Sequence, residues 1–440
     1  MSNPLSSSLR SSNLNFIFLA LAVSALLALP AFAGSQARIV RLSDVQGSVQ
    51  IDKNTGLGFE NAFLNLPITQ GTQLRTGENG RAEVEFEDGS AMRLGPGTEV
   101  EFSSLGLDDS GKRLSQVSLV EGTAYVKWRA KDKDQITLTF SRETATLDRP
   151  GHVRADATAT YAHLAVFRGE AEVEGPAGKV MVAKNQTATF DESNDDKSKV
   201  GNGVAEAPLD SWDRNATSYY DQYSRNNSYN SSPYGYGTSD LNYYGSYSNV
   251  AGYGTLWQPY FTGIGWDPFA DGAWGWYPGL GYMFASAYPW GWLPYHYGNW
   301  LYIPSNGWMW QPGGWNSWVT APSYKPTTLV HVNPLVAPTT GATKTVVVGK
   351  GGELSLMPSR LVLNNGSAGI GIPRGSLDNL SHLNKQVTRT GTVELHVEPQ
   401  FAAISARGFT LAEPSGPEPL SSSSSPHSSS TSTVHSGAHH

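Results

Sequence analysis

The residues with the clearest chemical potential in this chain are tryptophans that recur in the pattern Trp-x-Trp-x-Pro. Three copies start at Trp274, Trp290 and Trp308, and eleven of the thirteen tryptophans lie between Trp257 and Trp318. Exposed indole faces can stack against the C–H faces of sugar rings, whereas buried indoles can replace an aliphatic core, because each aromatic side chain buries about 150–250 Å². The pattern therefore leaves two hypotheses open, a carbohydrate- or partner-binding surface and an aromatic core.

Few aliphatic residues accompany these tryptophans, so we expect most of the indoles to form the core of a small domain. The faces that this core leaves exposed would then supply a binding surface. His296 is the only histidine embedded among aromatic residues, and it could contact a ligand or serve as a hydrogen-bonded structural residue. The candidate binding surface consists of Trp292, Tyr295, His296, Tyr297 and Trp300.

Familiar catalytic signatures are missing from the sequence. It contains no Gly-x-Ser-x-Gly, His-Glu-x-x-His or Gly-x-x-x-x-Gly-Lys-Ser/Thr motif. Carboxylate pairs such as Asp108 and Asp109 lie in turn-like surroundings, and the tail histidines His435, His439 and His440 have no preorganised geometry for a metal. We therefore predict a non-enzymatic protein without catalytic residues, cofactor or metal, and an enzyme with an unfamiliar site is the least supported alternative.

Composition narrows the partners and the compartment. The net charge of −7 and the charged fraction of 16% leave no basic patch that would recruit nucleic acid. Cysteine is absent, which excludes disulfides, cysteine-ligated zinc and a lipoprotein anchor on an N-terminal cysteine. An exported protein of this size without disulfides is typical of the bacterial envelope.

The N-terminus has the pattern of a secretory signal peptide over residues 1–33. Arg10 precedes an apolar run from Phe16 to Leu29, which is too short to span a bilayer of about 30 Å. A small-x-small sequence then predicts cleavage between Ala33 and Gly34. We expect a periplasmic or secreted protein with no transmembrane span after cleavage, and an uncleaved anchor is the alternative.

Residues 38–192 read as nearly continuous β structure. Apolar and polar residues alternate in short runs such as 81–86, 116–119 and 136–140, as half-buried strands require. Turn sequences such as Gly77-Glu78-Asn79-Gly80 separate the runs at intervals of about ten residues. This spacing predicts a mainly β fold, an antiparallel sandwich or roll.

Five sequence pieces in this region recur in the same order in a known family. They are Gly47-Ser48-Val49, Leu74–Gly77 with Arg81–Val84, Asp88–Thr98, Leu119–Val126 and Val166–Val173. On these pieces the region resembles the FecR-like domain. The resemblance implies an extracytoplasmic β domain, which in founding members receives a signal from an outer-membrane siderophore transporter. Those members sit in the inner membrane and control a sigma factor through a cytoplasmic segment, which we do not find ahead of the apolar run.

The remaining chain divides by composition. Residues 193–250 are rich in Ser, Tyr, Asn and Gly, which is typical of a flexible linker, although 208–212 could begin a short helix. Residues 251–320 hold the Trp-x-Trp-x-Pro repeats. On a strand, such a repeat places both indoles on one face, and the proline should end the strand or lie at an edge. We expect a β-prone extension over 321–413 that completes or wraps this domain, and a disordered Ser/His-rich tail over 414–440.

The Trp repeats resemble a Trp/Gly/Pro-rich domain of unknown function that follows FecR-like domains in exported bacterial proteins, and the run from Trp290 to Trp300 carries this resemblance. The sequence thus predicts an exported, non-enzymatic envelope protein whose two modules bind an envelope protein or a cell-wall glycan. One alternative is a FecR-type regulator of sigma-factor or siderophore signalling, held by an uncleaved anchor. Another is a carbohydrate-binding protein that uses exposed Trp and Tyr faces.

Overall fold

The computed structural model describes residues 38–131, 134–191, 193–194, 197–224, 235–315, 323–326, 335–349 and 360–396. All of them belong to one unit, Met1–Pro399. The predicted signal peptide, its cleavage site at Ala33 and Gly34, and the predicted tail over 414–440 lie outside the described residues. No helix in the described part of the chain has the length and apolar character that a membrane crossing needs.

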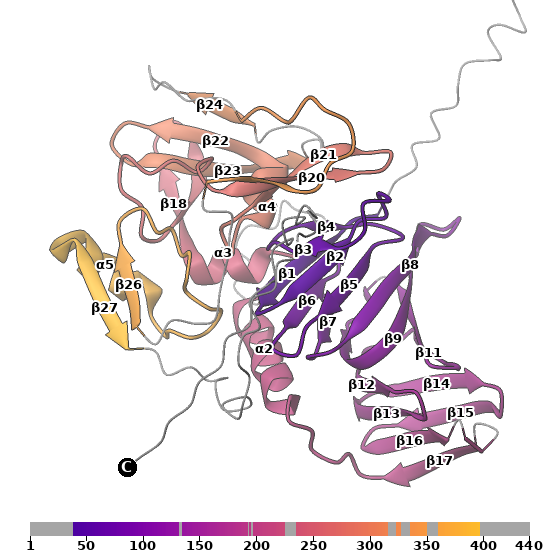
Figure 1. The fold of residues 1–440 in the computed structure, drawn as a ribbon. Helices are drawn as coiled ribbons and strands as arrows, with labels where there is room; N and C mark the ends of the chain where they lie inside the picture. Colours follow the sequence, from indigo (N-terminus) through magenta and orange to yellow (C-terminus); the bar gives the residue numbers. More distant parts are fainter. Residues whose placement is uncertain are drawn as a thin grey trace, which may run out of the picture. The chain divides into compact units, whose positions relative to one another are not determined.

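The first part of the chain forms two β-sheets that share one long strand (Figure 1). Sheet A contains, in spatial order, β4 (Pro67–Ile68), β1 (Val40–Gln46), β6 (Arg81–Glu85), β7 (Ala91–Leu94), the second half of β9 (Arg113–Trp128), β12 (Gly151–Ala157), β13 (Tyr161–Arg168), β16 (Gln186–Asp191) and β17 (Lys197–Asn202). Sheet B contains β3 (Glu60–Asn61), β2 (Val49–Asp52), β5 (Gln73–Thr76), β8 (Glu99–Leu107), the first half of β9, β10 (Gln135–Phe140), β11 (Glu143–Leu147), β14 (Glu170–Gly175) and β15 (Gly178–Ala183). Every pairing in the two sheets is antiparallel except that of β9 with β10.

Strand β9 passes from sheet B to sheet A at Gly122. Glu121 pairs with β8 of sheet B, whereas Gly122 already pairs with β12 of sheet A. Gly122 has a φ of +94°, and a Cβ there would lie 2.4 Å from the Thr98 hydroxyl oxygen. Only glycine fits this backbone and this close approach, so the residue fixes the point at which the two sheets separate.

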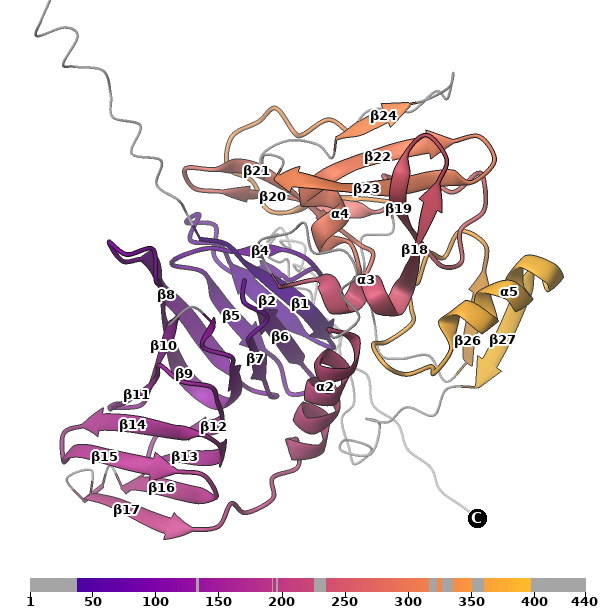
Figure 2. The same cartoon turned by 180° about the vertical axis from the view of Figure 1, so that it is seen from behind.

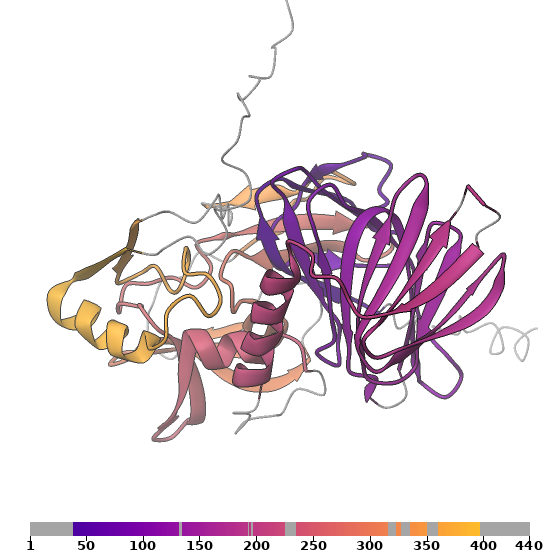
Figure 3. The same ribbon diagram turned by 90° about the horizontal axis from the view of Figure 1, so that it is seen from below.

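Figure 3 shows the strands of the two sheets from below, in indigo to magenta. An apolar core fills the space between the sheets. The alternating runs predicted as strands appear as β6, β8, β9 and β10, and their apolar members, such as Val84, Val117 and Leu138, are at most 1% exposed. Burial of apolar surface contributes about 25 cal/mol per Å² and dominates the stability of such a sandwich. The mainly β fold predicted from the alternation is confirmed.

The outer face of sheet A carries charged residues that are nevertheless buried. In β6, Ala82 and Val84 point into the core, so Arg81, Glu83 and Glu85 point to the opposite face. Those three residues are only 8%, 2% and 1% exposed. Later segments of the chain must therefore cover this part of the sheet, and they supply the partners that its charges need.

The range 193–250 is not the flexible linker that its composition suggests. Where it is described it contains β17, helix α2 (Asp210–Tyr223), helix α3 (Thr238–Tyr244) and the start of the next sheet. The tyrosines and Trp212 explain the difference, because Trp212, Tyr219 and Tyr220 are at most 5% exposed and provide the buried face that aliphatic residues would otherwise supply. The expected helix start near Leu209 is confirmed by α2.

The Trp-rich part forms small sheets (Figure 2). The side chains buried among them are mainly aromatic. One sheet has the order β18 (Gly245–Val250), β19 (Gly254–Pro259), β23 (Gly307–Trp315), β22 (Tyr297–Ile303) and β24 (Tyr324–Pro326). A second has the order β21 (Gly281–Ser286), β20 (Gly272–Tyr277) and β25 (Val346–Val348), and the short helix α4 (Trp292–His296) precedes β22. Strands from the predicted extension therefore pair with both sheets, as a wrapping segment would.

The three Trp-x-Trp-x-Pro copies adopt three different structures. The first lies on β20, which ends directly before Pro278 as predicted. The second is not a strand, because Trp292 and Pro294 lie in α4, where a proline is tolerated since first-turn N–H groups have no intrahelical acceptor. In the third copy Pro312 lies inside β23, beside a register shift at Gly298, where φ is +63°. The bulge admits a residue that cannot donate to the ladder.

Beyond these sheets the described chain ends in a hairpin with one helix. It contains β26 (Arg360–Asn364), α5 (Leu380–Thr390) and β27 (Thr392–His396). The side chain of Asn379 accepts from the backbone N–H of His382 at 2.9 Å and begins α5, and Gly391 follows its end. The sequence reading did not anticipate this helix.

Candidate functional site

The five residues proposed as a binding surface are buried. Trp292 and Trp300 are 0% exposed, Tyr297 is 2% exposed, and Tyr295 and His296 are 3% exposed. All the tryptophans and tyrosines among them belong to the aromatic core, so the predicted surface is wrong and the alternative, an aromatic core, describes these residues. The reason is the shortage of aliphatic residues in this part of the chain, so that aromatic side chains fill most of the interior.

Several indole N–H groups of this core have hydrogen-bond acceptors, which hold their rings in place. Trp290 donates to the carbonyl oxygen of Ala368 at 2.6 Å, and Trp257 donates to that of Leu241 at 3.0 Å. The Trp290 ring also stacks on Tyr288, with centroids 4.9 Å apart. A buried indole usually has such an acceptor, so Trp290 and Trp257 act as oriented core residues.

His296 is a structural residue at neutral pH. Its ring lies edge-on to Trp292, with centroids 4.8 Å apart. Burial, with a further contribution from the positive charge of Arg41, lowers the pKa of His296 to about 3. The imidazole is therefore neutral in its folded surroundings and is not a cation in the aromatic core.

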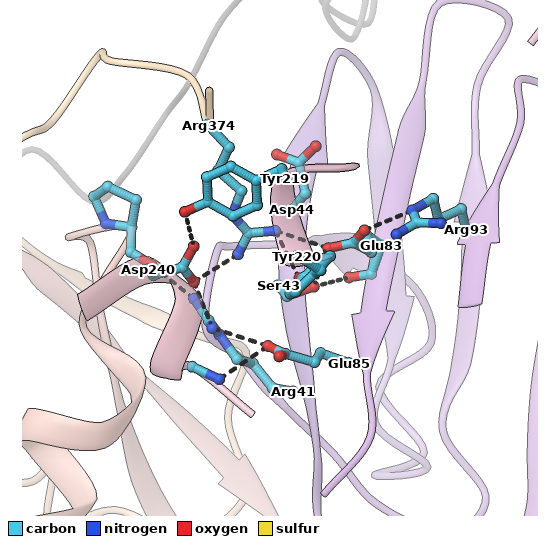
Figure 4. Close-up of polar contacts among 12 residues, drawn as sticks. Arg41, Ser43, Asp44, Glu83, Glu85, Arg93, Tyr219, Tyr220, Asp240 and Arg374 are labelled. Atoms are coloured by element: carbon cyan, nitrogen blue, oxygen red, sulfur yellow. Dashed lines mark hydrogen bonds and ion pairs between the residues drawn. The ribbon is translucent and has the colours of Figure 1, made fainter. Parts of the chain in front are cut away.

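The most concentrated polar chemistry lies elsewhere, in what we call the buried charge cluster (Figure 4). Arg41 of β1 is one of its centres. Its Nη1 lies 2.7 Å from Oδ2 of Asp240 in α3 and 3.1 Å from Oε2 of Glu85 in β6. Its Nε donates to the Asn65 side chain at 2.9 Å, and its Nη2 donates to the Pro289 carbonyl oxygen at 2.6 Å. The guanidinium thus joins sheet A to α3 and to the second Trp repeat. The members of the cluster are Arg41, Glu83, Glu85, Arg93, His152, Asp213, Asp240 and Arg374.

Arg374 is the second centre. Its Nη1 lies 2.7 Å from Oε1 of Glu83, and its Nη2 lies 2.8 Å from Oδ2 of Asp240. The hydroxyls of α2 complete the arrangement, because Tyr220 donates to Glu83 at 2.6 Å and Tyr219 donates to Asp240 at 2.8 Å. In Figure 4 these groups converge between sheet A and the helices.

Arg93 of β7 extends the cluster toward helix α2. Its Nε lies 2.7 Å from Oε2 of Glu83, and its Nη1 lies 2.7 Å from Oδ1 of Asp213. The other Asp213 oxygen lies 2.8 Å from Nε2 of His152. An unbroken series of contacts therefore runs from Arg41 through Asp240, Arg374, Glu83, Arg93 and Asp213 to His152.

Helix α2 binds sheet A through one acidic face. Asp210, Asp213, Thr217 and Asp221 are spaced by three or four residues and so share that face. Besides the Asp213 contacts, Asp210 pairs with Arg154 at 2.7 Å, Asp221 with Lys127 at 3.2 Å, and Thr217 accepts from Arg93 at 3.0 Å. The sequence reading missed this set, although the spacing of the aspartates could have indicated it.

The cluster holds carboxylates with very different proton affinities. Burial alone would raise the pKa of Glu83, but Arg93 and Arg374 together lower it to about 2. Burial raises the pKa of Glu85 to about 7, against the opposing effect of Arg41. Burial also raises the pKa of Asp44, beside the cluster, to about 6. Of these three carboxyl groups, Glu85 has the highest pKa.

The arrangement suits coupling between distant segments. Buried ion pairs contribute little net stability, but removal of one partner leaves an uncompensated charge. The strands, helices and loops that supply these charges are therefore fixed in position relative to one another. Within the described ranges, no group of three or more His, Cys, Asp or Glu side chains is placed to hold a metal ion.

Comparisons with known proteins agree with the two modules. Residues 72–172 match the family model described as FecR protein, and residues 238–335 match a family of unknown function, DUF6600. The chain therefore carries a FecR domain followed by a DUF6600 region. No protein with a curated function matches it.

Two crystal structures of a candidate anti-sigma factor from Parabacteroides distasonis are also similar to part of the chain. Sequence identities are 16% and 15%, and the TM-score is 0.27 for both. The alignments cover 30% and 34% of this chain. The chain spans 60% and 64% of the length of those solved chains.

Proposed function

We propose that this protein is a regulator of the FecR type, which conveys a signal by binding another protein outside the cytoplasm. The FecR match over residues 72–172 is the observation that carries the proposal. The apolar N-terminal run with its small-x-small sequence supports export. The partner we favour is an envelope protein, and a cell-wall glycan is the alternative partner.

The buried charge cluster supports a coupled response of the two modules. Glu83 and Arg93 lie within the FecR match, and Asp240 lies within the DUF6600 match. Arg374 contacts both Glu83 and Asp240, at 2.7 and 2.8 Å. A partner that shifts one module would have to break or rearrange these buried contacts, which gives a physical route by which binding at one module affects the other.

A transcript comparison in the source bacterium tests the regulatory role. The gene is deleted, and the strain is complemented with the wild-type protein, with Asp240→Asn, or with Glu206→Gln as a matched control at an exposed ion pair. We expect a defined set of transcripts to change on deletion and to return with the wild type and the control. We expect Asp240→Asn to restore them incompletely. An unchanged transcript profile after deletion would overturn the proposal.

N-terminal sequencing of the mature protein decides how the signal is passed on. A start near Gly34 would mean that the protein acts on a partner within the envelope. A retained N-terminal segment would favour the direct FecR route, in which an anchored protein controls a sigma factor in response to a siderophore signal. Capture of envelope proteins and of purified cell-wall polysaccharide by the tagged chain separates the two kinds of partner.

A further inference from the structure

A hollow of about 520 Å³ opens on the outer face of sheet A, beside its last strand. Short side chains form its floor, because Thr187, Thr189 and Gly201 stand where β16 and β17 run side by side. Arg154, His163 and Lys199 line it, together with the chain from Gly203 to Ala205. The hollow lies at the edge of the charged face, next to the part that helix α2 covers.

The covered part of this face shows what chemistry it accepts. Carboxylates of α2 bind there, with Asp210 on Arg154, Asp213 on Arg93 and Asp221 on Lys127. The hollow continues the same face from Arg154 outward to Lys199. Among the described residues, no helix covers Lys199 on this extension. Its ammonium group is therefore open to solvent, as the basic groups of Arg93 and Lys127 would be if α2 were removed.

The carboxylates that share the hollow's face already have donors. Asp156 accepts from the Thr123 hydroxyl at 2.7 Å and from Arg154 at 3.2 Å. Asp191, farther along the face, accepts from the backbone N–H of Ser193 at 3.1 Å and from its hydroxyl. Within the described ranges no carboxylate forms an ion pair with Lys199. A carboxylate from outside would complement this lysine.

Strand β17 also offers backbone groups. It pairs with β16 on one side, and no strand in the described part of the chain pairs with its other side (Figure 1). Successive side chains of a strand point to opposite faces. Val200 packs on the core, so Lys197 and Lys199 point to the other face of β17, which holds the hollow. An edge strand with lysines resists pairing with a second copy of itself, because like charges would meet. The same lysines favour an acidic strand.

We propose that β17 and the adjoining hollow bind an extended acidic segment of another protein, which adds to sheet A as a further strand. Carboxylates at alternate positions of that segment would face Lys197 and Lys199, and one of them would enter the hollow. Main-chain hydrogen bonds would supply affinity and the alternate carboxylates specificity. The proposal names the surface by which the proposed regulator meets its partner, and so rests on that partner being a protein.

Fluorescence anisotropy on the full mature chain tests the site with labelled heptapeptides. The probe is Thr-Glu-Val-Glu-Val-Glu-Thr, and the comparison peptide replaces each Glu by Lys. We expect binding of the acidic peptide only, at least tenfold weaker in Lys199→Glu. Lys179→Glu is the matched control, because Lys179 is an exposed lysine on another edge strand, β15. This variant should bind the acidic peptide as the wild type does.

Hydrogen exchange with the acidic peptide bound supplies a second readout, in which amides of β17 should gain protection. Equal binding by Lys199→Glu, equal binding of both peptides, or unchanged β17 protection would each overturn the site. So would Lys199-dependent binding of polygalacturonate without peptide binding, which would assign the surface to an anionic glycan. The transcript comparison is independent, so a failed peptide experiment beside a positive transcript result rejects this surface but not the regulator.

Discussion

Arg41 and Asp240 form an ion pair of 2.7 Å in which both side chains are 0% exposed. Arg41 lies on the first strand of sheet A, and Asp240 lies on helix α3, after the tyrosine-rich segment. The pair therefore ties the first strand of sheet A to the start of the DUF6600 match. Asp240 also binds Arg374, so its carboxylate serves two guanidinium groups.

Replacement of Asp240 by alanine tests this tie. We expect Asp240→Ala to lower the free energy of unfolding by about 3–5 kcal/mol, because two buried guanidinium groups lose a partner. Urea unfolding followed by tryptophan emission measures the change. Glu206→Gln removes an exposed partner of Arg214 and should leave the free energy of unfolding nearly unchanged. Similar losses in the two variants would contradict the role of the buried pair.

The raised pKa of Glu85 predicts a pH dependence of stability. The unfolded chain ionises this carboxyl near pH 4.5, whereas the folded protein retains the proton until about pH 7. The folded state binds more protons between these values, so the free energy of unfolding should fall as the pH rises through this window. Asp44, with a pKa of about 6, acts in the same direction.

Glu83 has the opposite effect at lower pH. Its pKa of about 2 means that its contribution to the free energy of unfolding is lost as the pH falls from about 4.5.

Urea unfolding of Glu85→Gln at pH 5 and pH 8 isolates the Glu85 contribution. We expect a smaller loss of stability between these values than in the wild type. A loss as large as in the wild type would show that Glu85 does not hold the proton.

The aromatic core predicts unequal costs among its tryptophans. Trp290 is 0% exposed and donates to Ala368 at 2.6 Å, so Trp290→Ala should cost about 3–5 kcal/mol of unfolding free energy. Trp276 belongs to another copy of the motif and is only half-buried, so Trp276→Ala should cost clearly less unfolding free energy.

The aromatic core also predicts a blue-shifted tryptophan emission that resists acrylamide quenching. Ready quenching of most indoles in the folded protein would contradict the core assignment.

Asn65 provides a second tie between the modules. Its amide nitrogen donates to the carbonyl oxygens of Ser286 and Tyr288, both at 2.8 Å, and its oxygen accepts from Arg41. We expect Asn65→Ala to cost about 1–3 kcal/mol for each buried group left unpaired. Asn54→Ala is the matched control, since Asn54 has a similar positive φ of 56° but is exposed. An equal cost at both positions would assign the effect to backbone strain alone.

The strands of sheets A and B could be predicted because the sequence pattern that marks them is local. Alternation in runs such as 81–86 and 136–140 directly reflects a face that packs on the core. The same alternation says nothing of what covers the other face. Glu83 and Glu85 read as solvent-facing residues, and only the contacts with Arg374 and Arg41 show that they are buried.

The candidate binding surface failed for a related reason. Trp292 and Tyr295 are aromatic and close together in the sequence, which is equally true of residues in a core and of residues on a surface. Which of the two applies depends on neighbours far along the chain, such as Phe269 beside Tyr295 and Tyr236 beside Trp292. The tyrosine-rich segment read as a linker because burial of Tyr219 and Tyr220 depends on acceptors in Asp240 and Glu83 that are distant in sequence.

Native-state hydrogen exchange in increasing urea tests most directly whether sheet A and the Trp-rich sheets are coupled through the buried charge cluster. We expect amides of β1 and β6 to share one opening free energy with those of β20 and β22, and Asp240→Ala to lower both together. Opening of β20 and β22 at low urea, with β1 and β6 still protected and unaffected by the substitution, would contradict the coupling of the two modules.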